Sequence, residues 1–251
     1  MRVLAVIPAR YASTRFPGKP LVMIAGKTML ERVWERTQAS GVGEVAIATD
    51  DERIFATAQG FGALVWMTRP DHPSGTDRLL EVADRMPGYD AYLNIQGDEP
   101  FVRPDQLQAL VGTLENHSGP AIGTLVTPIK TSEELHNPNA VKAVVSSSGR
   151  ALYFSRAVVP YLREVDPAGW LARGLHYRHL GLYAFNAAAI EALRPLTPNA
   201  LELAEGLEQL RWLCAGLPIY AAVTDSATPA IDTPDDLAHV EALLAKGKLE
   251  A

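Results

Sequence analysis

The first loop of the chain concentrates cationic side chains. Residues 8–20 contain Arg10, Arg15 and Lys19, together with two hydroxyl residues and a glycine. This loop directly follows an apolar run, residues 3–7, which predicts a buried first strand. Ligands of open α/β sheets bind outside the carboxyl ends of the strands, and arginine and lysine pair with phosphate oxygens. The loop therefore predicts a polyphosphate site, with a solvated basic loop as the alternative.

Two aspartates are candidate metal ligands. Asp98 follows a predicted strand whose outer end should lie beside the basic loop, and Mg²⁺ usually takes one or two carboxylates plus substrate phosphates. Asp232 precedes Thr233, which is a plausible N-cap for a closing helix. Asp235 and Asp236 suit the positive end of that helix, so Asp232 is the acid without a structural role. The alternative for Asp98 is a turn cap, and pairing the two acids is an inference.

Composition restricts the class of protein. The chain has 251 residues, 47% hydrophobic and 21% charged, and a net charge of -6. This balance is typical of a globular protein and argues against a nucleic-acid or anionic-membrane surface. We expect no membrane insertion, because no apolar run approaches about 20 residues, and no signal peptide, because the N-terminus is a predicted strand without a cleavage region. The single cysteine, Cys214, excludes an internal disulfide, and the cytoplasm is the simplest compartment.

Apolar runs alternate with helix-period segments in the first half of the chain. This rhythm predicts an α/β fold with a mostly parallel central sheet and helices on both faces. The predicted strands are 3–7, 45–49, 64–67 and 92–96, and the predicted helices are 29–40, 51–61, 77–86 and 104–116.

The second half is less regular and predicts a smaller mixed-strand patch. Strands are predicted at 124–128, 141–146, 151–154, 183–185 and 220–223, with helices at 201–215 and 235–246. The helix 201–215 should bury one stripe, formed by Leu203, Leu207, Leu210 and Cys214. We interpret residues 1–251 as a single domain with an inserted substrate-side patch roughly within 124–215.

Several common nucleotide motifs are absent. No Gly-x-Gly-x-x-Gly follows the first strand, which disfavours a dinucleotide site. Gly18-Lys19 lacks the Walker spacing and is followed by Pro20, which disfavours a P-loop enzyme. No Gly-x-Ser-x-Gly elbow is present for a hydrolase. The first loop must therefore hold phosphate mainly through side-chain cations.

Together these residues carry a family resemblance. The chain resembles the 3-deoxy-manno-octulosonate (Kdo) cytidylyltransferases over essentially its whole length. The strongest segments are 7–20, 74–78, 96–100, 137–142, 153–156, 178–181, 207–211 and 232–234. The first loop alone would also fit cytidylyltransferases for sialic acids, so the later segments carry the specificity.

The resemblance implies a nucleotide-diphospho-sugar transferase fold, a homodimer, and conversion of CTP and Kdo to CMP-Kdo and pyrophosphate for lipopolysaccharide synthesis. It implies Mg²⁺ held by Asp98 and Asp232, with Arg10, Lys19 and these two acids as the catalytic set. The implied nucleotide-binding residues are Pro8, Ala9, Arg10, Arg15, Lys19, Ser74, Gly75, Thr76 and Arg78. Those implied around the sugar acid are Gln96, Arg156, His179, Tyr183, Glu208 and Gln209. The hypothetical mechanism is in-line attack of the sugar 2-hydroxyl on the α-phosphate.

Each of these sugar-side residues except Gln96 also has a plain structural interpretation. Arg156 suits a carboxylate, or is an exposed strand-end arginine, and His179 fits a structural role as well as a ligand. Tyr183 alternates with apolar neighbours, as in ordinary sheet packing. Glu208 and Gln209 lie off the predicted leucine stripe and should therefore be outside the core.

The remaining candidates have no functional interpretation. Cys214 is expected in the core, and His72, His117, His136, His176 and His239 support no functional hypothesis. Two other functions stay open: a cytidylyltransferase for 8-amino-Kdo or a sialic acid, and a non-catalytic nucleotide-binding module.

Overall fold

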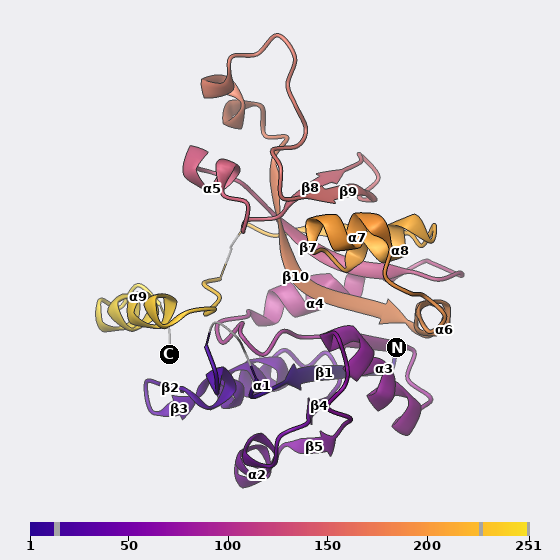
Figure 1. The fold of residues 1–251 in the computed structure, drawn as a ribbon, viewed down its shortest axis with the longest axis vertical. Coiled ribbons are helices and arrows are strands. Elements are labelled where there is room, and N and C mark those ends of the chain that lie inside the picture. Colours follow the sequence, from indigo (N-terminus) through magenta and orange to yellow (C-terminus); the bar gives the residue numbers. More distant parts are fainter. Residues whose placement is uncertain (13–15, 226–227, 250–251) are drawn as a thin grey trace. The chain divides into compact units, whose positions relative to one another are not determined.

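The computed structural model describes residues 1–12, 16–225 and 228–249. The chain divides into two compact units (Figure 1): unit 1 comprises Met1–Gln108 and Thr228–Ala251, and unit 2 comprises Ala109–Ala227. The patch predicted within 124–215 falls in unit 2, while the single-domain assignment stays a prediction. In the described part of the chain no helix is both long and apolar enough to cross a bilayer.

Unit 1 contains a parallel sheet in the order β6-β1-β4-β5. Its strands are β1 (Val3–Ala9), β4 (Glu44–Thr49), β5 (Leu64–Met67) and β6 (Ala91–Asn94). β1 pairs with β4 from Leu4 opposite Glu44 to Ala9 opposite Thr49. β1 lies between two neighbours and helices cover both faces of the sheet, so all its side chains except Pro8 are buried, which explains its continuous apolar sequence.

Helices connect these strands, and their amino ends are capped by side chains. Thr28, Asp51, Ser74 and Thr233 each accept a backbone N–H of the helix that follows. The helices are α1 (Met29–Ala39), α2 (Glu52–Gly60), α3 (Gly75–Arg85), α4 (Pro104–Gly112, whose last residues belong to unit 2) and α9 (Pro234–Ala245). A one-turn 3-10 helix, η1 (Lys19–Leu21), and the hairpin β2 (Met23–Ile24) and β3 (Lys27–Thr28) follow the first loop.

The order of connections places the ligand crevice. The chain runs from β1 through α1 to β4 and through α2 to β5, and then returns through α3 to β6 on the other side of β1. Right-handed crossovers in opposite directions put α1 and α2 on one face and α3 on the other. The direction of winding therefore reverses between β1 and β6, and such a reversal opens a crevice at the carboxyl ends of the strands.

Unit 2 contains the mixed patch that the sequence predicted. β7 (Ile122–Pro128) pairs in parallel with β11 (Ile219–Val223) and antiparallel with β10 (Tyr177–Asn186). β8 (Lys142–Val145) and β9 (Ala151–Ser155) extend it with antiparallel pairs. Its helical segments are α5 (Ser132–His136), η2 (Pro167–Gly169), η3 (Leu171–Arg173), α6 (Ala187–Leu193), α7 (Ala200–Glu205) and α8 (Gln209–Cys214).

The prediction of one helix over 201–215 is wrong. The segment forms α7 and α8, which are separated at Gly206, where φ is 60° and the helix ends in a left-handed residue. The expected stripe is divided accordingly: Leu207 and Leu210 are buried, whereas Leu203 is 72% exposed. The Cys214 prediction is also wrong, since this residue is exposed.

Candidate active site

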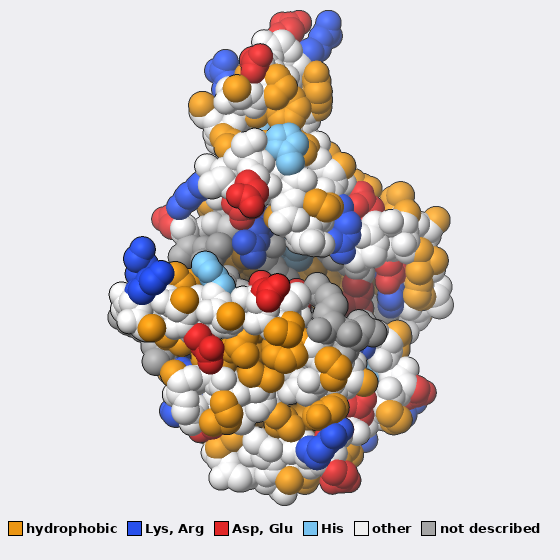
Figure 2. Space-filling view, turned by 60° about the vertical axis from the view of Figure 1, so that its left-hand side comes forward, with side chains coloured by type: hydrophobic (Ala, Val, Ile, Leu, Met, Phe, Trp, Pro, Cys, Tyr) orange, Lys and Arg blue, Asp and Glu red, His pale blue; other side chains and the backbone are white. Residues whose placement is uncertain are grey.

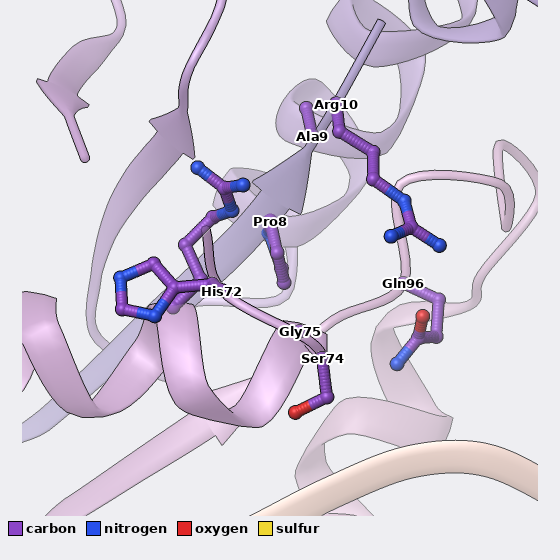
Figure 3. A pocket seen from close by; sticks show the side chains of 8 residues that line it. Pro8, Ala9, Arg10, His72, Ser74, Gly75 and Gln96 are labelled. Atoms are coloured by element: carbon purple, nitrogen blue, oxygen red, sulfur yellow. The ribbon is translucent and has the colours of Figure 1, made fainter. Parts of the chain in front are cut away.

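Most of the nucleotide-side residues that the sequence predicted converge in unit 1, beyond the ends of β1 and β6. Two cavities of about 180 and 110 Å³ share the wall residues Pro8, Ala9, Arg10 and Gln96. The larger is lined in addition by Lys19, Asp98 and Asp232, and the smaller by His72, Ser74, Gly75 and Arg78. Figure 3 shows the Arg10 guanidinium pointing toward Gln96. Arg15 lies outside the described residues, and Thr76 is buried at 3% exposure.

The two candidate metal ligands meet at one lysine. The Lys19 Nζ lies 2.8 Å from Asp98 Oδ2 and 3.0 Å from Asp232 Oδ1. The backbone also ties the two acidic segments together, because the Ile231 N–H donates to the Asp98 carbonyl at 3.1 Å. The two aspartates that the sequence analysis paired therefore lie close together in the structure.

Local structure fixes Asp232. The Asp236 carboxylate accepts the backbone N–H groups of Asp232 at 3.0 Å and Thr233 at 2.8 Å, while Thr233 caps α9. These hydrogen bonds and the capping box tie the backbone of Asp232 to the start of α9. On the other side, Ile231 is fully buried in a cluster with Ile24, Met29, Phe101 and Val240.

The residues present fit a magnesium ion. Among the described residues, no group of three or more histidine, cysteine or acidic side chains could hold a metal. Mg²⁺ needs no such cage, because it keeps several waters and binds through one or two carboxylates plus substrate phosphates. Asp98 and Asp232 beside two cationic side chains match that donor set, and Mg²⁺ itself stays a prediction.

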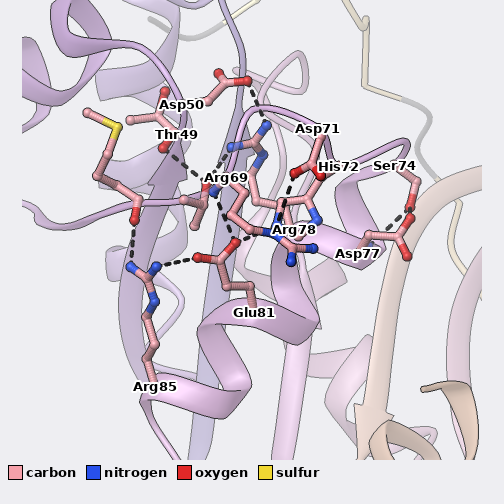
Figure 4. Close-up of polar contacts among 12 residues, drawn as sticks. Thr49, Asp50, Arg69, Asp71, His72, Ser74, Asp77, Arg78, Glu81 and Arg85 are labelled. Atoms are coloured by element: carbon pink, nitrogen blue, oxygen red, sulfur yellow. Dashed lines mark hydrogen bonds and ion pairs between the residues drawn. The ribbon is translucent and has the colours of Figure 1, made fainter.

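Polar contacts behind the smaller cavity fix its wall (Figure 4). Ser74 caps α3 and donates its hydroxyl to Asp77 at 2.6 Å. Arg78 is 3% exposed, and its guanidinium donates to Thr68 and, at 3.0 Å, to Asp50. Arg78 therefore holds the strand ends that carry Asp50 and Thr68 against α3 in addition to lining the cavity.

Sequence reasoning missed His72, which belongs to this wall. The His72 Nε2 hydrogen-bonds to the Glu81 carboxylate, which also accepts the Arg69 N–H at 3.0 Å and pairs with Arg85 (Figure 4). Burial opposes ionisation of Glu81, but the hydrogen bonds from His72 and Arg69 and the charge of Arg85 leave its pKa below the usual value. In Figure 3 the His72 ring points away from Ser74 and Gln96. Its hydrogen bond to Glu81 on α3 holds the loop that carries His72 against this helix. No sequence signal pairs a loop histidine with a glutamate on the following helix.

A stacked array closes the base of the basic loop. The Arg53 guanidinium lies 3.3 Å from the centre of the Tyr11 ring and forms two hydrogen bonds to Asp51, of 3.0 and 2.7 Å. The Gly18 N–H donates to the Tyr11 carbonyl at 2.9 Å. Gly18 has a φ of 73°, and a Cβ there would lie 3.0 Å from the Tyr11 ring. Glycine is therefore required where the loop turns into Lys19.

The predicted sugar-side residues other than Gln96 lie in unit 2. His179 and Tyr183 on β10 are buried, and their ring centres are 5.4 Å apart. The Thr124 hydroxyl lies 2.9 Å from the Leu182 carbonyl and 2.9 Å from His179 Nε2. A hydroxyl has one proton, which Thr124 donates to the carbonyl, so His179 Nε2–H is the donor to Thr124.

Burial determines the ionisation of both side chains. It lowers the pKa of His179 from 6.5 to about 3, with a smaller contribution from Arg178. It also raises the pKa of Tyr183 well above 10, with a further contribution from the Glu208 carboxylate. Both groups are therefore neutral hydrogen-bonding partners around neutral pH.

Arg156, Glu208 and Gln209 surround the break between α7 and α8. The Arg156 side chain donates to the carbonyls of Glu205 at 2.6 Å and Pro138 at 3.0 Å. Arg156 thus holds the carboxyl end of α7 in place. Glu208 is half-buried, but Gln209 is 4% exposed, so the expectation that Gln209 lies outside the core is wrong. The break at Gly206 turns Gln209 inward, where an unbroken helix would have exposed it.

An α/β unit with a cation-lined crevice at a sheet switch point is typical of proteins that bind phosphate-bearing ligands such as nucleotides. The family model described as "Cytidylyltransferase" matches residues 4–219. Two similar proteins are the 3-deoxy-manno-octulosonate cytidylyltransferases of Cytophaga hutchinsonii and Myxococcus xanthus. The first is 47% identical over 95% of this chain and 96% of its own, and the second is 49% identical over 97% and 96%.

Solved structures agree with these sequence relatives. CMP:2-keto-3-deoxy-manno-octonic acid synthetase complexed with CTP superposes with a TM-score of 0.90, at 40% identity over 98% of this chain and 100% of that one. A cytidylyltransferase from Leptospira borgpetersenii, 18% identical over 98% of this chain and 87% of its own, superposes with a TM-score of 0.64 and shows the fold alone. The chain therefore belongs to the cytidylyltransferase family, and within it to the 3-deoxy-manno-octulosonate cytidylyltransferases.

The stack on Tyr11 can be tested without a ligand. Arg53→Ala removes the cation from the ring, and exposed cation–π contacts contribute about 0.5–1 kcal/mol. We expect the Gly18 amide to exchange with solvent about two- to fivefold faster, as measured by NMR hydrogen exchange. Arg103→Ala is a matched control, because Arg103 pairs with Asp105 through two 2.9 Å bonds at the same sequence separation. Equal Gly18 exchange in both variants would show that the stack does not hold the loop.

The buried His179 should make stability depend on pH. In the unfolded chain His179 takes up a proton below pH 6.5, whereas the folded protein resists protonation down to about 3. The unfolded state then binds more protons, so stability is lost as the pH falls. His179→Gln keeps a donor for Thr124 but cannot titrate. Relative to this variant, the free energy of unfolding in urea should fall by about 2 kcal/mol between pH 6.5 and 5; parallel curves would contradict burial of a neutral imidazole.

Proposed function

We propose that this chain transfers CMP from CTP to Kdo and releases pyrophosphate. The observation that carries the proposal is the meeting of Asp98, Asp232 and Lys19 in the crevice that Arg10 also lines. This is the set of charges that a triphosphate and a divalent cation require. The relative complexed with CTP, 40% identical over nearly the whole chain, supports cytosine as the base.

The chemistry follows from charge. The 2-hydroxyl oxygen of Kdo attacks the α-phosphorus of CTP in line, a new O–P bond forms, and the α–β bridging bond breaks with its electron pair leaving on pyrophosphate. The hydroxyl proton passes to solvent. Asp98 and Asp232 would hold Mg²⁺, which would offset phosphate charge and make the hydroxyl more acidic. Arg10 and Lys19 orient the triphosphate and stabilise the departing pyrophosphate, so the protein needs no nucleophile of its own.

Within unit 2, we assign recognition of the sugar acid to the polar side chains around β10 and the Gly206 break, and the assignment of Gln96 in unit 1 rests on the family resemblance alone. Neutral His179 and protonated Tyr183 suit sugar hydroxyls, because each has hydrogen-bonding atoms and neither adds charge. Glu208 and Gln209 follow the Gly206 break and add acceptors and donors. Arg156 is the cation proposed for the carboxylate, in addition to its carbonyl partners.

The remaining expectations are also part of this proposal: a homodimer, a cytoplasmic location, and a role in supplying activated Kdo for lipopolysaccharide. A segment of unit 2, the arm (residues 156–176), supports the dimer. Its Trp170 packs with Ile129 and Leu135, while Tyr161 meets Trp170 edge-on and is 76% exposed. Figure 2 shows hydrophobic side chains on the surface of the arm, at the top. Leu175, at the other end of the arm, is 50% exposed, and exposed hydrophobic side chains on a small packed segment favour a protein contact.

Pyrophosphate release tests the function. CTP, UTP, ATP and GTP are each assayed with Kdo, 8-amino-Kdo, a sialic acid or no sugar. We expect turnover with CTP and Kdo, at a kcat/KM at least tenfold above every other pair. Preference for another sugar acid would assign that substrate, and tight CTP binding without pyrophosphate would favour the non-catalytic module.

Asp98→Asn sharpens this test. Losing a charge that stabilises the transition state should lower kcat by about 10²-fold or more at saturating Mg²⁺. Asp235→Asn is the control, because Asp235 is an exposed acid in the first turn of α9. Near-normal turnover of the Asp98 variant would refute its role as metal ligand.

The arm predicts where the dimer forms. Tyr161→Asp places a charge on an exposed position, so the fold should be unaffected while the dimer dissociation constant rises at least tenfold, as seen by multi-angle light scattering over a dilution series. Met23→Asp is the control, since Met23 is a 53% exposed hydrophobic residue of unit 1. A Tyr161 variant as dimeric as the control would place the contact elsewhere.

A further inference from the structure

Lys19 makes a contact that phosphate binding does not explain. Its ammonium sits between Asp98 and Asp232, 2.8 and 3.0 Å from their oxygens, and its side chain is only 13% exposed. The aspartate side chains are 27% and 40% exposed. A phosphate-binding lysine could equally project into solvent, whereas this one is directed at two acids.

The contact has a clear electrostatic consequence. Two carboxylates that approach one point repel each other, and a positive charge between them attracts both and offsets that repulsion. Backbone contacts hold the two carboxylates close together. The Ile231–Asp98 backbone hydrogen bond joins the segments that carry Asp98 and Asp232, and the α9 capping box holds the second segment in place. A positive charge is therefore needed at this point even when no metal is bound.

The backbone presents Lys19 to this point. Gly18, in its left-handed conformation, turns the chain into η1, and Pro20 is buried directly after Lys19. The base of the side chain is thus fixed, while its four-carbon stem leaves the ammonium able to move by a few ångströms.

We propose that Lys19 is a positioning residue that occupies, in the nucleotide-free protein, the place between Asp98 and Asp232 that a divalent cation takes when the nucleotide binds. This rests on the proposed function, since it needs those acids as metal ligands. Free divalent cations then bind weakly, because each must displace the ammonium. A triphosphate draws Lys19 onto its own oxygens and opens the place, so metal and nucleotide bind with positive coupling in both directions.

The alternative is a general effect of positive charge in the crevice. Arg10 lines the same cavity, and within the described residues no hydrogen bond or ion pair joins it to Asp98 or Asp232. Arg10→Met and Lys19→Met each remove one charge from this cavity, but only the second removes the contact.

Mn²⁺ binding, followed by the EPR signal of the free ion, distinguishes these cases without turnover. In nucleotide-free protein we expect Lys19→Met to bind Mn²⁺ at least tenfold more tightly than wild type, and more tightly than Arg10→Met. The double variant Lys19→Met/Asp232→Asn should return to weak binding. Without Mn²⁺, Lys19→Met should melt at a lower temperature than wild type, and Mn²⁺ should raise its melting temperature more than that of wild type.

The outcomes separate this inference from the proposed function. Equal Mn²⁺ affinity in Lys19→Met and Arg10→Met would overturn the role of Lys19, while wild type that binds Mn²⁺ with a non-hydrolysable CTP analogue would leave the metal site standing. If wild type binds no Mn²⁺ even with the analogue, the metal site itself fails and the inference with it. If Lys19→Met does not fold, Lys19→Gln takes its place. In either case, wild type must bind Mn²⁺ at least tenfold more tightly with the CTP analogue than without it.

Discussion

Like charges must be brought together in this protein, and the rest of unit 1 is organised around that requirement. Asp98 and Asp232 approach the same point, which lies in a crevice suited to a polyphosphate. Such an assembly is unfavourable unless cations are fixed beside it, because close charges in a partly buried site are weakly screened. Lys19 and Arg10 provide the cations, and the capping box of α9 and the Ile231–Asp98 bond hold the acids in place.

The fold provides the position for these charges. Winding reverses between β1 and β6, so the loops after these two strands diverge and leave a crevice. The wall of this crevice is stiffened from behind by part-buried polar contacts, such as the ion pair of Arg78 with Asp50 and the hydrogen bond of His72 to Glu81. Breaking one partner of such a pair leaves a buried group unsatisfied, which makes the wall a rigid support for the side chains that face the ligand.

Unit 2 follows a different electrostatic rule. Its proposed sugar-side groups include a histidine whose pKa is lowered to about 3 and a tyrosine whose pKa is raised. Burial therefore keeps His179 and Tyr183 neutral, while the helix break at Gly206 turns Gln209 inward. Recognition by neutral groups suits a substrate with many hydroxyls, and a charged substrate carboxylate needs only one cation.

The sequence by itself determined the elements and residue types whose signals are local. Residues 3–7 are predicted as a strand because a buried parallel strand is apolar throughout. Thr233 is predicted as a helix cap because its hydroxyl accepts an N–H group only three residues further on. Only the tertiary structure decided that Lys19 contacts Asp232, 213 positions away, and that His72 is held by Glu81. These contacts depend on which strand ends and loops meet in the fold, and that is not expressed in the pattern of nearby residues. The break of segment 201–215 differs, because Gly206 is itself a local signal for the end of a helix.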